Sequence, residues 1–208
     1  MVKKVADLNT EEKILQAARS VLFAKGYAGS RMQDIADEAG INKALLHYYF
    51  RSKEKLFEVI FTDAIGRILP AVTLIFGDDD LHIFDKLRKF CSIYIHTWIE
   101  HPYIPMFVLH ELHTNKGEGI DKILKKVSGK PIMAVFTTIE KAVRNKEIRP
   151  ISPPQLMLNI MSLCIFPFVG KPVFKKIVGI PDKQYEAILE ARTTEVAEFI
   201  IEAIKYRK

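Results

Sequence analysis

Four side chains between residues 43 and 48 recur at helical spacing and could contact a nucleic acid. Lys43 and His47 are four residues apart, and so are Ala44 and Tyr48, so a helix would carry all four on one face. The ammonium, imidazole and phenol groups can donate to or accept from base edges and phosphates, and an alanine permits close approach. This spacing fits a DNA-reading face, and it also fits the solvated face of a small helical bundle.

The elements that would position this face are two short helices joined by a tight turn. Ser30 and Gln33 predict a capping box at the start of the first, and Gly40 predicts its end because glycine readily adopts a positive φ. Asn42 predicts the N-cap of a second short helix that runs to about Phe50. Two such helices have the geometry of a helix-turn-helix, whose second helix enters the major groove of DNA.

Longer helices are predicted before and after this pair. Asn9 and Glu12 predict a capping box for a first helix that ends at Gly26. Ser52 predicts the N-cap of the following helix, whose N-terminus favours phosphate. Residues 1–55 hold ten Lys or Arg and seven Asp or Glu, which is a net +3 out of +6 for the whole chain. About a quarter of the chain therefore carries half of the basic excess.

The same segment resembles the N-terminal signature of the TetR family of transcriptional regulators. The resemblance covers about residues 10–60, in order and without gaps, and it favours DNA binding over the solvated-face interpretation. The matching residues are Gly26-Tyr27, Asp34-Ile35-Ala36, Ala39-Gly40-Ile41, Lys43, Leu46, Tyr49-Phe50 and Ser52-Lys53-Glu54-Lys55-Leu56.

The resemblance implies roles for individual positions in binding a double-stranded DNA operator. Gln33 would contact a base, and Tyr49 and Lys53 would face phosphates. Base or nearby backbone contacts would come from Lys43, Ala44, His47 and Tyr48. Two departures make the operator sequence specific to this chain: Leu45 stands where the family commonly has Thr, and His47-Tyr48 stands where it often has Tyr-His.

The rest of the chain is predicted to be helical as well. Pro70 would kink or interrupt the helix after Ser52. Further helices are expected at about residues 81–100, 102–114, 131–145, 153–169 and 181–205, with a loop at 115–119. The predicted fold is all-α with about nine helices. A three-helix helix-turn-helix DNA-binding domain (1–55) precedes a larger helical effector-binding and dimerisation domain (56–208).

The family resemblance implies a small-molecule effector in the larger domain, and several side chains are suitable for its pocket. Tyr94 and Trp98 are the best pair, because each brings a polar atom that needs a partner when buried. The full candidate set is Cys91, Tyr94, Trp98, Phe107, His110 and Phe136. Aromatic and sulfur-containing side chains are also what ordinary hydrophobic cores use, and for any single one of these residues the core is the favoured interpretation.

The last two predicted helices are the candidates for a homodimer interface. Leu158 and Phe166 belong to an uncharged stretch too apolar to be left in water, and Phe199 lies on an apolar face of the final helix. A two-fold dimer would place two recognition helices on successive half-sites of a palindromic operator. We interpret the chain as a ligand-responsive regulator, and the family resemblance implies that it is a repressor. The alternative is a DNA-binding protein whose C-terminal domain binds other proteins and takes no small ligand.

Other classes of function have weaker support. Two cysteines exclude a disulfide scaffold, and no signal-peptide core follows Lys3-Lys4, so we expect a cytoplasmic protein without a membrane span. Common catalytic and phosphate-binding motifs are absent, so we expect neither an enzyme nor a cofactor. His110 and His113 are one residue closer than in the H-E-x-x-H zinc motif, which leaves a metal-dependent enzyme as a third, weaker interpretation.

Overall fold

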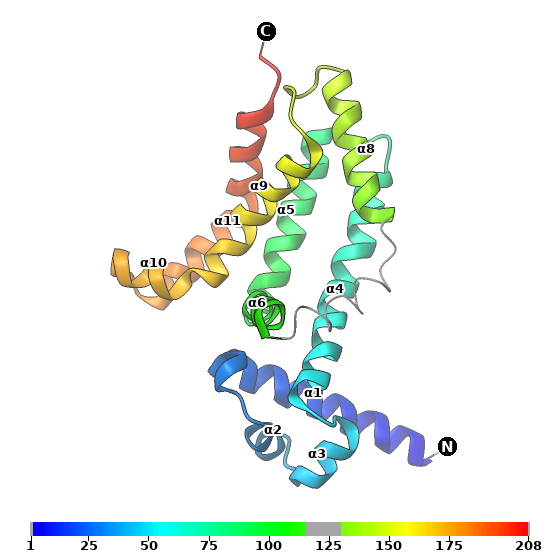
Figure 1. The fold of residues 1–208 in the computed structure, drawn as a ribbon, viewed down its shortest axis with the longest axis vertical. Coiled ribbons are helices and arrows are strands. Elements are labelled where there is room, and N and C mark those ends of the chain that lie inside the picture. Colours follow the sequence, from blue (N-terminus) through cyan, green and yellow to red (C-terminus); the bar gives the residue numbers. More distant parts are fainter. Residues whose placement is uncertain (1, 115–129, 208) are drawn as a thin grey trace. The chain divides into compact units, whose positions relative to one another are not determined.

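The computed structural model describes residues 2–114 and 130–207, and for residues 2–8, 67, 110–114 and 130 it describes the backbone only. All regular secondary structure in these ranges is helical (Figure 1), apart from one isolated bridge between Ile148 and Lys205. The predicted all-α fold is confirmed. The described helices are α1 (Val2–Gly29), α2 (Met32–Glu38), α3 (Lys43–Tyr49), α4 (Lys53–Gly77), α5 (Ile83–Glu100), α6 (Ile104–Thr114), α8 (Lys130–Arg144), α9 (Pro153–Val169), α10 (Lys171–Val178) and α11 (Asp182–Ile204).

Helix α10 is absent from the predicted set. Gly170 and Pro172 suggest a break in the chain, but proline is also well suited to the first turn of a helix, where its missing N–H costs nothing. Gly179 ends α10 with a φ of 73°. The predicted loop at 115–119 lies outside the described residues.

The chain forms two compact units. The first contains the described residues up to Ala64 together with α6, and the second contains Ile65–Glu100 and the described residues from α8 onward. Helix α4 contributes its N-terminal part to the first unit and its C-terminal part to the second. The functional division at residues 55/56 stays a prediction.

The first unit is built around the apolar faces of α1, α2 and α3. Its fully buried side chains include Ile14, Leu22, Ile35, Leu46 and Phe57. These residues come from α1, α2, α3 and α4, so a single core fixes the two short helices against the longer ones. Burial of such a side chain stabilises the fold by roughly 1.5–3 kcal/mol.

The turn between α2 and α3 forms as predicted. Gly40 has a φ of 64°, the left-handed conformation that favours glycine. The side-chain oxygen of Asn42 accepts a hydrogen bond of 2.7 Å from the Leu45 backbone N–H and caps α3.

Both predicted capping boxes upstream of this turn are wrong. Helix α1 already runs from Val2, so Asn9 lies inside it. Ser30 is 2% exposed and donates to the Gly26 carbonyl at 2.6 Å. The backbone N–H of Arg31 donates instead to the Asp34 carboxylate at 3.0 Å, which ties down the start of α2. Ser30 cannot cap α2 because the break at Gly26 draws its hydroxyl toward α1.

Helix α4 continues through Pro70, so the predicted interruption does not occur. Val72, Ile75 and Phe76 beyond the proline are all buried. Their burial at roughly 1.5–3 kcal/mol each offsets the cost of about 3 kcal/mol for an interior proline.

Two stretches have the length and hydropathy of a membrane span. They are α4, and α9 taken together with α10, to which it is bent by 69°. The core helix of a folded domain passes the same test, and Leu56, Phe57, Ile60 and Phe76 of α4 are buried in the protein core.

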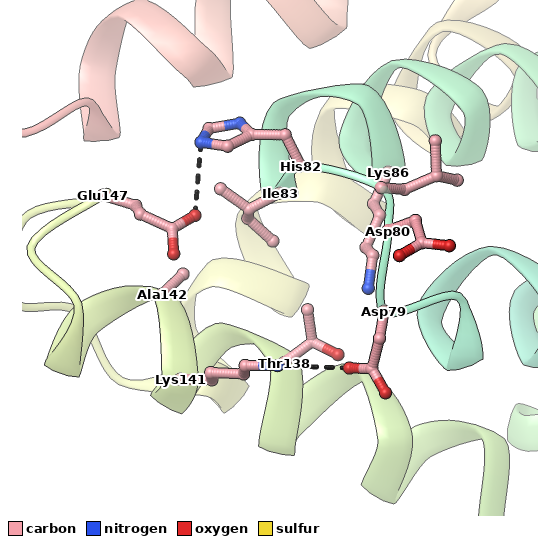
Figure 2. Close-up of a pocket in the computed structure, with 10 residues that line it drawn as sticks. Asp79, Asp80, His82, Ile83, Lys86, Thr138, Lys141, Ala142 and Glu147 are labelled. Atoms are coloured by element: carbon pink, nitrogen blue, oxygen red, sulfur yellow. Dashed lines mark hydrogen bonds and ion pairs between the residues drawn. The ribbon is translucent and has the colours of Figure 1, made fainter.

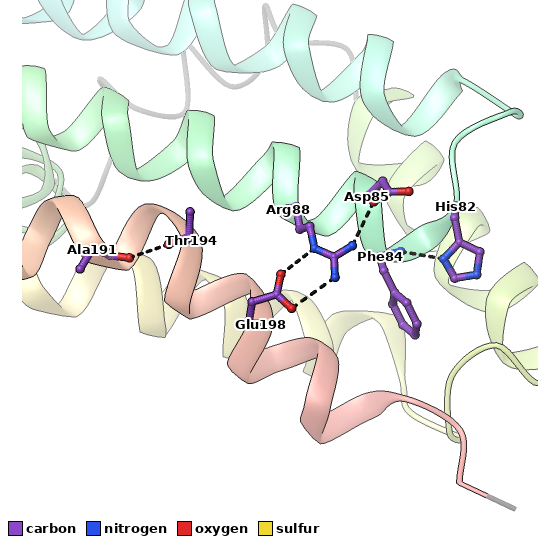
Figure 3. A network of polar contacts seen from close by, with 7 residues as sticks. All are labelled: His82, Phe84, Asp85, Arg88, Ala191, Thr194 and Glu198. Carbon is purple, nitrogen blue, oxygen red and sulfur yellow. Dashed lines mark hydrogen bonds and ion pairs between the residues drawn. The ribbon is translucent and has the colours of Figure 1, made fainter.

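The second unit is organised around α5, which packs along α11 and against α9. Leu87, Cys91 and Ile95 of α5 are almost completely buried. On the outer side, the Arg88 guanidinium donates to both carboxylate oxygens of Glu198 on α11, at 2.6 and 3.2 Å, and to Asp85 at 3.0 Å (Figure 3). This pairing lowers the pKa of Glu198 below its ordinary value.

Candidate nucleic-acid interface

Helix α3 divides its residues between a buried and an exposed face, and the exposed face is the one that the sequence predicts. Leu46 is fully buried, and Phe50 just after the helix is 5% exposed. The predicted contact residues Lys43, Ala44, His47 and Tyr48 all lie on the exposed side. Tyr48 is 79% exposed, an unusual position for a large aromatic side chain without a partner surface.

The polar groups on this face are available to an incoming ligand. Within the described residues, neither Lys43 nor Arg51 has an ion-pair partner. The Nδ1 atom of His47 lies 3.2 Å from the Arg51 carbonyl, so the N–H at Nδ1 donates inward and Nε2 remains for contact with DNA. The rings of Tyr48 and Tyr49 meet edge to face at 5.4 Å, which limits the rotation of both.

Gln33, on α2, is also exposed, but its side chain is engaged in the free protein. Its amide nitrogen donates to the Asp37 carboxylate at 2.7 Å. A base contact by Gln33 therefore requires this hydrogen bond to open or to be shared.

Lys53 has a structural position that the sequence does not reveal. Its ammonium donates to the Tyr27 carbonyl at 2.8 Å and to the Ser30 carbonyl at 3.2 Å, and it lies 4.1 Å from the centre of the Tyr27 ring. Burial lowers its pKa below the ordinary value of 10.5, opposed in part by the neighbouring Glu54. Lys53 thus fastens the N-terminus of α4 to the connection between α1 and α2. Its predicted phosphate contact stays a prediction.

Tyr27 is a positioning residue that the sequence reasoning missed. Its ring packs against Phe57 at 4.6 Å and Phe107 at 5.0 Å, and its hydroxyl donates to Glu54 at 3.3 Å. Burial would raise the pKa of Glu54, but hydrogen bonds from Ser52, its own backbone N–H and Tyr27, with the charge of Lys53, lower it overall. The available signal was the Gly26-Tyr27 pair in the family signature.

The predicted effector residues are only partly brought together. Cys91, Tyr94 and Trp98 are buried along α5, and the Tyr94 and Trp98 rings meet at 5.2 Å. Burial raises the pKa of the Tyr94 hydroxyl, and the Trp98 indole N–H approaches this hydroxyl without a hydrogen bond of good geometry. Cys164 of α9 lies against Cys91, a contact that raises the pKa of the Cys164 thiol.

The other three effector candidates lie elsewhere. Phe107 belongs to the first unit, where its ring packs at a tilt against Phe57, with ring centres 4.3 Å apart, so it contributes to the core that holds Tyr27. Phe136 is half-buried on α8. The side chains of His110 and His113 lie outside the described part of the chain. Among described residues, no group of three His, Cys, Asp or Glu side chains is placed to hold a metal ion.

The second unit has a polar pocket of about 240 Å³ between the start of α5 and the end of α8. Figure 2 shows its ion pairs: His82 with Glu147 at 3.2 Å, and Lys141 with Asp79 at 3.1 Å. Lys86 is 4% exposed and donates to the Phe76 carbonyl at 3.3 Å, where a cation suits the C-terminal end of α4. None of the effector candidates whose side chains are described lines this pocket.

An apolar surface runs along α9 and α11. A groove of about 470 Å³ is lined by Leu163, Phe166, Ile188 and Arg192 among others. A second groove of about 310 Å³ shares Ser162 and Leu163 with it and extends to Phe199, so the two form one continuous surface. We call this surface the α9–α11 face.

Comparison with known proteins agrees with this arrangement. The sequence model described as "Bacterial regulatory proteins, tetR family" matches residues 14–60, which include α2, α3 and the start of α4. The HTH-type transcriptional repressor NicS of Pseudomonas putida is 26% identical over 185 residues, covering 86% of this chain and 85% of NicS.

Two solved structures share the whole fold. The regulator FadR from Bacillus subtilis, solved in complex with stearoyl-CoA, has a TM-score of 0.66 at 18% identity and covers 91% of this chain and 97% of its own. The hemolysin II transcriptional regulator HlyIIR has a TM-score of 0.64 at 22% identity, over 96% and 98% of the two chains. At these identities the likeness concerns the fold: a helix-turn-helix domain followed by a helical domain.

Proposed function

We propose that this chain is a regulator of the tetR family, whose model matches residues 14–60, and that it is a dimeric repressor released from a palindromic operator by a small-molecule effector. The observation that carries the proposal is the exposed face of α3. It presents a cation, an imidazole and a phenol on a helix whose other side is anchored in a core. Repression is supported by the relative NicS, which is named as a transcriptional repressor.

In this proposal, Lys43, Ala44, His47 and Tyr48 enter the major groove, and Gln33 reaches a base beside it. Tyr49 and Lys53 contact phosphates. Leu45 is 37% exposed on the same helix and is suited to the methyl group of a thymine.

The α9–α11 face is proposed as the homodimer interface. Leu158, Phe166 and Phe199 are 59%, 64% and 67% exposed, which is unfavourable in water and normal at an interface core. A two-fold dimer supplies the second α3 that a palindromic operator requires.

The effector is proposed to bind in the second unit, near Tyr94 and Trp98. It releases the operator by binding more tightly to a state of the dimer that does not fit DNA. The neighbour FadR was solved with stearoyl-CoA, so an apolar acyl compound is the first class to test. The alternative, a C-terminal domain that binds only other proteins, predicts an operator affinity that no metabolite changes.

We place the protein in the cytoplasm, where its DNA target is found, and assign it neither an enzymatic step nor a cofactor. The proposal concerns binding equilibria alone.

The test is selection of bound sequences from genomic fragments, followed by affinity measurements at several salt concentrations. We expect a palindromic site whose half-sites lie about one helical turn apart. His47→Ala should weaken binding by about 1–3 kcal/mol and alter the base preference at one position of each half-site. Lys183→Ala, on an exposed part of α11, should bind as the wild type does. Absence of any selected sequence at moderate salt contradicts the proposal.

A further inference from the structure

The α9–α11 face contains one cation whose hydrogen bonds are incomplete. Arg192 lines the first groove among apolar side chains, and its Nη2 donates to the Leu163 carbonyl at 2.6 Å. Its Nε is buried and has no hydrogen-bond partner in the described part of the chain. A guanidinium covered by a second molecule would lose the water that now solvates its exposed edge, so it needs an anion.

The composition of the face restricts where that anion can come from. Helix α9 has no charged residue from Pro153 to Val169. On α11, Ile188, Arg192 and Phe199 line the two grooves. Glu195 is exposed, and the spacing i, i+4, i+7 and i+11 from Ile188 places it on the same stripe of the helix. Glu195 is therefore the acid that lies on this stripe between Arg192 and Phe199.

Glu195 has no partner of its own among the described residues. It is exposed and forms no ion pair, not even with Arg192 three residues earlier in the same helix. Glu202, the next acid along α11, already pairs with Lys205 at 2.5 Å. Arg149, at the far end of the second groove, donates to the Ala203 carbonyl at 2.8 Å. This leaves one cation and one carboxylate in the middle of the face.

We propose that Arg192 pairs with Glu195 of the partner subunit in the homodimer, which makes two equivalent ion pairs across the two-fold axis. In a two-fold interface, a contact from residue i to residue j is accompanied by one from j to i. A patch that carries a carboxylate and a guanidinium close together is therefore complementary to a second copy of itself. The axis then passes near the middle of α11, where the two grooves meet at Ser162 and Leu163.

The pair would also determine which chains can dimerise. The surrounding contacts are apolar and accept many partners, whereas two charges of the same sign brought together in a water-poor interface are strongly unfavourable. A related chain with a different charge order on α11 would be rejected. This inference rests on the proposed dimer through the α9–α11 face and adds to it the residues that give specificity.

The test uses charge reversal in the full chain, with the dimer dissociation constant measured by analytical ultracentrifugation. Arg192→Glu and Glu195→Arg should each raise that constant at least tenfold, and the double variant should return to within about threefold of the wild type. Glu190→Arg makes the same charge change on an exposed part of α11 away from the face, and it should have no effect. Circular dichroism establishes that each variant is folded.

A mixture of the two single variants distinguishes pairing between subunits from pairing within one chain. Arg192→Glu opposite Glu195→Arg places opposite charges at both contacts, so native mass spectrometry should show heterodimer in excess of either homodimer. If the double variant recovers but the mixture does not, the pair lies within one chain and the inference is wrong.

The remaining outcomes are also decisive. Single variants that dimerise like the wild type contradict the inference while leaving the proposed dimer intact. Weakening by Arg192→Glu alone shows that Arg192 serves another anion, such as the carboxylate of a small ligand, and overturns it. A wild-type chain that is monomeric at every concentration instead contradicts the proposed function.

Discussion

At the scale of the residue, two lysines of the first unit illustrate different uses of the same charge. Lys43 is exposed on α3 without an ion-pair partner in the described chain, whereas Lys53 is half-buried and donates to two backbone carbonyls. Lys43 is therefore available for its proposed contact with DNA. Lys53 contributes to the fold, and its proposed phosphate contact would come in addition.

We therefore expect the two alanine variants to separate stability from binding. Lys53→Ala should lower the free energy of unfolding by about 1–3 kcal/mol, because hydrogen bonds from a charged group are lost. Lys43→Ala should change it by no more than about 0.5 kcal/mol while weakening operator binding. Urea denaturation and DNA titration measure the two effects. Equal stabilities of the two variants would show that the carbonyl contacts of Lys53 contribute nothing.

At the scale of the element, α3 has only seven residues, so its ends contribute a large share of its order. Asn42 caps its N-terminus, and Leu46 and Phe50 anchor its inner side. The orientation of the exposed face of α3 depends on both the cap and these buried side chains.

Removing the cap should therefore affect stability and DNA binding together. Asn42→Ala should cost about 1 kcal/mol of stability, because the Leu45 N–H loses its acceptor. Asn42→Ser retains an oxygen at the cap and should recover most of it. Thermal unfolding and operator affinity, measured on both variants, check this. If the serine variant is as destabilised as the alanine variant, the hydrogen bond at the cap does not account for the loss of stability.

The contact between α5 and α11 predicts a dependence on pH. Arg88 lowers the pKa of Glu198 below its ordinary value of 4.5, so the folded state favours the ionised carboxylate. The stabilisation is present above pH 4.5 and is lost as the pH falls through the lowered pKa. Glu198→Gln should flatten the decline of the melting temperature in this acidic range. Glu190→Gln should not, because it removes a carboxylate that forms no ion pair within the described residues. Parallel pH profiles for the wild type and Glu198→Gln would contradict this assignment.

At the scale of the whole molecule, the proposed function couples operator binding to dimerisation, because each subunit of the proposed dimer would supply one α3 to the palindrome. The α9–α11 face is far from α3 in sequence, yet its apolar side chains are expected to decide the affinity for a palindrome.

Placing a charge on this face should abolish dimers and reduce operator affinity by at least a hundredfold. Phe199→Asp buries a carboxylate at the proposed interface, a change that costs several kcal/mol. Leu74→Asp is the matched control: Leu74 is 74% exposed and Phe199 67%, but Leu74 lies on α4 and outside the α9–α11 face. Size-exclusion chromatography with light scattering reports the oligomer. If the Phe199→Asp variant is still dimeric, the dimer interface does not lie on the α9–α11 face.

Much of the fold can be predicted from the sequence because it depends on neighbours in the chain. Periodicity places Leu46 inside and Tyr48 outside, and Asn42 and Gly40 mark the ends of the two short helices. The all-α class and most helix positions follow from the same local rules. The eight-residue α10 was missed because its glycine and proline also suit a break.

Only the tertiary structure decided which distant residues meet. Lys53 reaches a carbonyl 26 residues away, and Phe107 leaves the set of effector candidates because it packs on Tyr27 and Phe57 in the first unit. Arg192 is singled out in the same way, because it lines a groove that α9 and α11 form together. Helical periodicity and caps are determined over a few residues, whereas burial and partner choice depend on contacts between segments that no local pattern encodes.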